Sequence, residues 1–160
     1  MRSLPFALLL SLAAAAPAWS AANLDVVHVW PGYRKPESFD RIADYFHGGE
    51  DRTGETVRRS QSAERAGFYF LVRLKNPGPA LAAASFELKV VTPDSPKTRT
   101  FTFQADLPAG THAFDLGLTG ADWAGPKVNP VAWQLTVRSP DGAELARQQS
   151  FLWAEPPAAH

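Results

Sequence analysis

Histidine is the side chain in this sequence with the widest chemistry, because it can act as a general base or as a metal ligand. The histidines are His28, His47, His112 and His160. They are too scattered to form a local metal-binding pair, and the sequence has no cysteine to complete a zinc site. The sequence therefore predicts no metal and no other cofactor.

Calcium would need several carboxylates in close succession. The aspartates at Asp94, Asp115, Asp122 and Asp141 instead stand alone. We expect each of them to be a turn or surface residue.

Covalent catalysis has no local signature either. The Gly-x-Ser-x-Gly pattern of a nucleophile elbow is missing, and the absence of cysteine excludes thiol chemistry. Paired carboxylates that hydrolyse sugars are brought together by the fold and leave no fixed spacing in the sequence. A hydrolase with such a non-local site stays open as an alternative, but the sequence predicts a protein that is not an enzyme.

Aromatic residues in expected loops are the strongest functional lead. Trp30, Tyr33 and Arg34 follow the first expected strand in a Pro-Gly turn. Trp123 lies in a second aromatic loop, and Trp153 closes the last expected strand. An exposed indole can stack on a ligand or anchor a partner protein, so these five residues form the candidate ligand or partner surface. The alternative is that the aromatic rings close the ends of the fold.

The first 22 residues have the layout of a secretory signal peptide. Arg2 precedes an apolar run over residues 4–16, and small residues up to Ala22 provide the cleavage site. The apolar run is shorter than the roughly 20 residues that span a bilayer, so we expect no membrane span. We therefore predict cleavage near Ala22 and a periplasmic or secreted protein. The expected organisation is a signal peptide over 1–22, a single β-sandwich domain over 23–154 and a flexible tail over 155–160.

Charge excludes some partners. The sequence has 16 Lys and Arg against 16 Asp and Glu, a formal net charge of +0. A neutral chain has no long-range attraction for nucleic acid, so we expect no nucleic-acid partner. The arginines between residues 52 and 65 are matched by neighbouring acidic residues, which favours a solvated strand over a partner-binding strip.

The elements that must position these residues are strands. Apolar side chains occupy alternate positions at Phe68, Phe70, Val72 and Leu74. The same period of two recurs over 86–90, 101–103 and 131–137, with turn signals at 93–96 and 139–142. A period of two places one set of side chains on a core face, which predicts strands throughout the centre of the chain. Imperfect alternation over 147–150 predicts a bulge or an edge position there.

One short helix is expected near the start of the mature chain. Phe39, Ile42, Ala43 and Phe46 repeat at the spacing of a helix face, and two glycines follow. An extended edge strand is the alternative for this segment. The fold class that these patterns predict is all-β: an antiparallel, immunoglobulin-like β-sandwich of seven to eight strands with one short helix.

The functional expectation follows from the export signal, the strands and the missing reactive motifs. We expect an exported, non-catalytic binding or scaffolding protein whose partner is another protein. An edge strand over 144–153 could bind that partner by strand addition. The alternative is a carbohydrate-binding module that uses Trp30, Tyr33 and Trp123.

Overall fold

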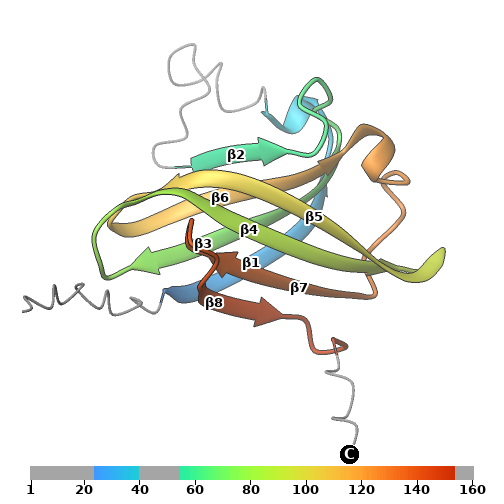
Figure 1. Ribbon diagram of the computed structural model, residues 1–160. Coiled ribbons are helices and arrows are strands. Elements are labelled where there is room, and N and C mark those ends of the chain that lie inside the picture. The colour runs from blue at the N-terminus through green and yellow to red at the C-terminus, as the bar shows by residue number, and fades with distance from the viewer. Residues whose placement is uncertain (1–23, 40–54, 154–160) are drawn as a thin grey trace, which may run out of the picture.

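The chain folds into two packed β-sheets. The computed structural model describes residues 24–39 and 55–153, which include eight strands (Figure 1). The first sheet has the order β1 (Asp25–Arg34), β3 (Gly67–Asn76), β6 (Gly110–Thr119), β2 (Glu55–Arg59). The second has the order β5 (Ser95–Leu107), β4 (Leu81–Thr92), β7 (Ala132–Arg138), β8 (Glu144–Gln149). The predicted all-β sandwich is confirmed.

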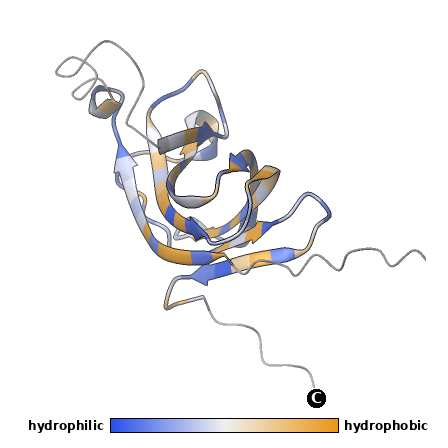
Figure 2. Cartoon of the chain, turned by 90° about the vertical axis from the view of Figure 1, so that its left-hand side faces the viewer, coloured by the Kyte–Doolittle hydropathy of each residue, from blue (hydrophilic) through white to orange (hydrophobic). Residues whose placement is uncertain are grey.

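The core lies between the sheets and follows the predicted alternation in β3 and β4, whereas Val131, the first residue of the run predicted over 131–137, is exposed and precedes β7. Phe68, Phe70, Val72 and Leu74 of β3 are buried, as are Phe86, Leu88 and Val90 of β4. Figure 2 shows hydrophobic and hydrophilic residues alternating along the strands. Burying each large apolar side chain contributes roughly 1.5–3 kcal/mol, so the aromatic residues take the place that disulfides have in other small domains.

Strand pairing follows the predicted turns. Strand β4 pairs antiparallel with β5, with Phe86 opposite Phe103, and the turn between them lies at 93–94. The 139–142 turn joins β7 to β8, where the Ser139 amide donates to the Ala143 carbonyl at 2.9 Å. Gly142 adopts a φ of 89°, which favours glycine. The edge position predicted for 147–150 is confirmed, because β8 is an end strand, whereas the register shift of β8 lies earlier, between Glu144 and Ala146.

The predicted turn at Trp30–Arg34 is wrong, because these residues continue β1. Their register against β3 runs without a break from Trp30 opposite Leu71 to Arg34 opposite Gly67. Proline is tolerated at Pro31 because β1 is an end strand, where a missing N–H can face away from the sheet. The ladder to β3 therefore overrides the local Pro-Gly signal.

Strand β2 lies within residues 52–65, where a solvated strand was expected, and the sequence predicted no pairing partner for it. It lies at the edge of the first sheet, parallel to β6, with Val57 opposite Asp115. The other strand pairs of the described chain are antiparallel. The two sheets also meet at one side, where the Leu24 amide donates to the Leu145 carbonyl of β8 at 3.1 Å.

Some predicted segments fall outside the described residues. Residues 37–39 are helical, but the rest of the helix expected over 39–46 lies outside them, as do the signal peptide over 1–22 and the tail over 155–160. Within the described ranges, no helix has the length and apolar character needed to cross a membrane.

Candidate functional site

The outer face of the first sheet is the most unusual surface of the fold, because it contains buried residues where period two predicts exposure. Two cross-strand rows define it. One row runs Gly32, Tyr69, Gly117, Arg59, and the next runs Trp30, Leu71, Asp115, Val57. Tyr69 and Asp115 are fully buried in these rows, although both side chains point away from the core between the sheets.

Tyr69 lies at the centre of this face. A Cβ added to Gly117, directly opposite on β6, would overlap the Tyr69 ring, so the absence of a side chain there makes room for it. Phe39 packs on the ring at a centroid distance of 5.1 Å, and the Arg34 guanidinium lies 5.7 Å from the ring centroid. The Tyr69 hydroxyl donates a hydrogen bond of 2.7 Å to the Arg65 carbonyl.

An ion pair lies beside this ring. Nη1 of Arg34 is 2.8 Å from Oδ2 of Asp115, whose side chain is 0% exposed, while the Arg34 side chain is 21% exposed. Removing a carboxylate from water is unfavourable unless a cation and hydrogen bonds replace the solvent, and Arg34 supplies such a cation. The expectation that Asp115 is a turn or surface residue is therefore wrong, and Arg34 is held by a structural contact.

Burial raises the pKa of Tyr69 from 10.0 to about 12. Exclusion of water disfavours the phenolate and is the largest cause; the positive charge of Arg59 opposes the rise, and the negative charge of Asp115 adds to it. The phenol is therefore neutral well above neutral pH, which does not suit it to act as a base.

Stability should fall in alkali because of Tyr69. Between pH 10 and about 12 the folded chain keeps a phenolic proton that the unfolded chain has released, so the free energy of unfolding decreases as pH rises. This contribution is complete below pH 10 and is lost as pH passes the folded pKa. We expect Tyr69→Phe to have a flatter stability profile over pH 9–11.5 than the wild type, measured by urea unfolding. Parallel profiles would contradict this assignment.

Trp123 closes one end of the sandwich. It is 7% exposed, and its ring lies 4.6 Å from that of Phe68. The short 3₁₀ turn η1 (Gly120–Asp122) leads into it, held by the Arg99 guanidinium, which donates to the Asp122 carbonyl at 3.0 Å. Tyr33 likewise packs against the core. Trp123 is thus enclosed and Tyr33 is partly buried, an arrangement that fits the end-closing alternative for Trp123.

The other predicted site residues do not come together. Trp30 is 45% exposed on the outer face of the first sheet. Trp153 is half-buried in the turn after β8, where its amide donates to the Ser150 carbonyl at 3.1 Å. Sequence reasoning missed Phe151 and Leu152, which are exposed beside Trp153. The available signal was that Phe151 and Leu152 are consecutive apolar residues, which breaks the alternation expected of a strand with one buried face.

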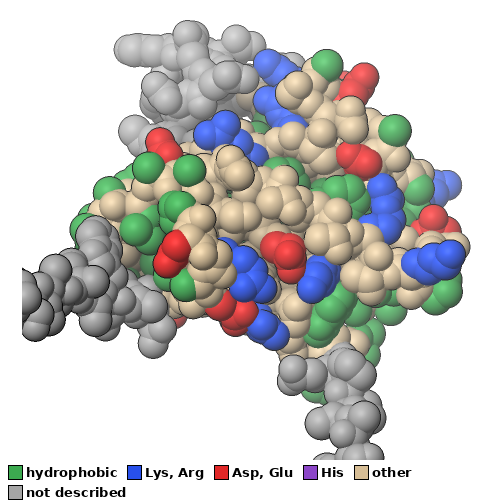
Figure 3. Space-filling view, viewed as in Figure 1, with side chains coloured by type: hydrophobic (Ala, Val, Ile, Leu, Met, Phe, Trp, Pro, Cys, Tyr) green, Lys and Arg blue, Asp and Glu red, His purple; other side chains and the backbone are tan. Residues whose placement is uncertain are grey.

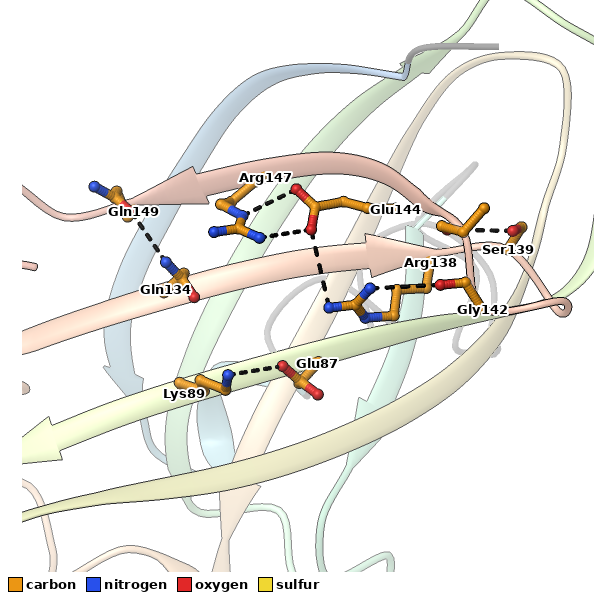
Figure 4. Close-up of polar contacts among 10 residues, drawn as sticks. Glu87, Lys89, Gln134, Arg138, Ser139, Gly142, Glu144, Arg147 and Gln149 are labelled. Atoms are coloured by element: carbon orange, nitrogen blue, oxygen red, sulfur yellow. Dashed lines mark hydrogen bonds and ion pairs between the residues drawn. The ribbon is translucent and has the colours of Figure 1, made fainter. Parts of the chain in front are cut away.

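The outer face of the second sheet is polar and mixed in charge. Figure 3 shows basic and acidic side chains interspersed over one face of the molecule. In Figure 4, Glu144 contacts Arg147 at 2.6 Å and Arg138 at 3.9 Å. Gln134 donates to Gln149 at 3.0 Å on the same face. Such exposed pairs contribute about 0–1 kcal/mol each and do not by themselves indicate a site.

Reactive groups do not converge in the described residues. Over 24–39 and 55–153, no three His, Cys, Asp or Glu side chains gather in a way that could hold a metal ion. The arrangement offers buried structural polar groups and exposed aromatic residues. No known protein family matches the sequence, and no curated protein matches it either.

Proposed function

We propose that this protein is an exported, non-catalytic β-sandwich that binds another protein. The observation that carries the proposal is an exposed apolar tip formed by Val131, Phe151 and Leu152. Phe151 is fully exposed, Leu152 is 63% exposed and Val131 is 45% exposed. Large apolar side chains gathered on a surface are typical of interfaces with other proteins.

The apolar tip is held in place by hydrogen bonds. The Ser150 amide donates to the Trp133 carbonyl at 2.9 Å, and the Trp133 amide donates to Oγ of Ser150 at 3.0 Å. Ser150 lies opposite Trp133, which Val131 precedes by two residues, and Phe151 and Leu152 follow Ser150 in the turn. The side chain of Gln149 closes the turn by donating to the Trp153 carbonyl at 3.2 Å. The tip is thus preorganised, which lowers the entropy lost on binding.

The neighbouring edge of the sheet supports the same partner class. In the described chain, no strand pairs with β8 on the side away from β7, although the Leu24 amide donates to the Leu145 carbonyl near the start of β8. Ser150 hydrogen-bonds to Trp133 across the antiparallel ladder, and such bonded positions alternate with non-bonded ones along a strand. Gln149, which precedes Ser150, is therefore a non-bonded position, so its N–H and C=O point away from β7. We propose that an extended segment of the partner adds to this edge and receives Phe151 in an apolar pocket.

The proposed fold type is immunoglobulin-like. The order β1-β3-β6 beside β5-β4-β7-β8 corresponds to strands A-B-E beside C′-C-F-G. Strand β2 departs from that pattern, since it lies beside β6 where strand D would lie but precedes β3 in the chain. Export is proposed from the signal-peptide pattern of residues 1–22.

The proposal is tested by photo-cross-linking in the cell that exports the protein. A benzophenone amino acid replaces Phe151 in the full chain, and a second variant carries it at the exposed Val27 on β1 as the matched control. We expect a discrete protein adduct from position 151 that position 27 does not give. Adducts of equal yield from both positions, or none from position 151, would overturn the proposal.

Affinity for the partner identified in this way gives a second measurement. We expect Phe151→Ala to weaken binding at least about tenfold, because an exposed anchor acts only in the complex. The free energy of unfolding should change by less than about 0.5 kcal/mol, since Phe151 contributes no burial in the free protein.

A further inference from the structure

We propose a second binding site, for an acidic carbohydrate, at the exposed indole of Trp30 between the basic side chains of His28 and Arg73 and the open space above Gly32. This Trp30 site comprises His28, Trp30, Gly32 and Arg73 on the outer face of the first sheet. It is separate from the apolar tip, which belongs to the second sheet and the turn after β8.

The geometry presents the indole in one orientation. A register shift between Val26 and His28 marks a bulge in β1, and such bulges re-aim side chains. The His28 ring then lies 4.2 Å from that of Trp30, and the Arg73 guanidinium carbon is 5.9 Å from the indole ring centroid. These neighbours support the indole while 45% of Trp30 stays exposed.

Gly32 provides room for a ligand next to the indole. It follows Trp30 at the next position on the same face of β1, and a Cβ added there would meet no atom within 4 Å. A flat ring can therefore approach the β1 backbone beside Trp30. The sequence alone could not reveal this open space beside Trp30, because it predicted a turn at these residues.

The chemistry of the neighbours selects an acidic sugar. A sugar ring presents C–H groups to the indole face and hydroxyl groups to the flanking donors. The Arg73 guanidinium can hold a carboxylate with two parallel hydrogen bonds. Lys75 follows Arg73 on the same face of β3 and lies opposite Asp25 in the ladder, whereas Arg73 is the cation that lies over the indole. One such cation is too few for the phosphate backbone of a nucleic acid.

Binding is tested with the full chain and two matched probes: tri-galacturonic acid and its methyl ester, which lacks the charges. We expect calorimetry to show tighter binding of the acid, by about tenfold or more, as expected for a charge-assisted pair. Arg73→Gln should abolish this preference. No binding of the acid, or equal binding of acid and ester, would overturn the proposal.

Two variants separate the site from the fold. Trp30→Ala removes the stacking surface, and Gly32→Val fills the open space without removing any group that contacts the ligand. Each should weaken binding of the acid at least about tenfold while the unfolding midpoint stays near that of the wild type. Unchanged binding in Gly32→Val would overturn the site.

Two controls separate the Trp30 site from a different surface and from a different class of ligand. Phe151→Ala should leave binding of the acid intact, because the apolar tip is a different surface. A hexaglutamate peptide tests the other macromolecular class: if it binds as tightly as the acid and loses binding in Trp30→Ala, the occupant is an acidic protein segment and the carbohydrate proposal is wrong.

Discussion

Arg34→Ala is expected to lower the free energy of unfolding by about 3–5 kcal/mol at pH 7, the cost of removing one partner of a buried ion pair. The reason is the position of Asp115, which is 0% exposed with its carboxylate 2.8 Å from the Arg34 guanidinium. The variant takes that cation away from a carboxylate that the fold buries. Urea unfolding followed by tryptophan fluorescence measures the change.

A double-mutant cycle assigns this loss to the pair. Asp115→Asn keeps the shape of the side chain but removes its charge, so Arg34→Ala should cost much less in that background. Arg73→Ala, an exposed arginine on the neighbouring strand β3, is the matched control and should change stability by less than about 1 kcal/mol. Equal losses from Arg34→Ala with and without the Asp115 charge would mean that the pair does not stabilise the fold.

Trp123→Ala is expected to destabilise the protein by about 3–5 kcal/mol, the usual range for truncating a buried aromatic residue. The indole packs on Phe68 at the closed end of the sandwich, and its removal leaves a cavity between the sheets. Had Trp123 belonged to an exposed sugar-binding surface, the same change would leave folding intact. Thermal and urea unfolding of the variant therefore separate the two interpretations directly.

Trp123→Phe provides the sharp comparison. The indole N–H is buried without a hydrogen-bond partner among the described residues, so replacing the indole with phenyl removes an unsatisfied donor. We expect Trp123→Phe to lose less than half of what Trp123→Ala loses. A Phe variant as unstable as the Ala variant would show that ring size alone decides the stability of this end.

The predicted strands were correct where local signals and burial agree. Phe68, Phe70 and Val72 needed only their alternation to be placed on the core face of β3. The turn at 139–142 needed only a proline and a glycine at positions that suit a reversal. Both patterns act over a few residues, so no knowledge of distant contacts was required.

The outer face of the first sheet could not be predicted in the same way. A period of two correctly places the Tyr69 and Asp115 side chains on the outer face of the sheet. It does not reveal that Arg34, at the end of β1, contacts Asp115 or that Phe39 packs on Tyr69. The same limit applies at Pro31, where pairing with β3 overrides a turn signal. Local propensity is worth less than about 1 kcal/mol per residue and yields to such pairing.

By itself, the sequence determined the central strands, the faces that they turn inward and the aromatic core, because a period of two is a property of neighbouring residues. Only the tertiary structure decided which face residues are covered, which strands are neighbours, and that Trp123 is enclosed while Trp30 stays in contact with solvent. These outcomes depend on contacts between segments far apart in the chain, and no local pattern records them.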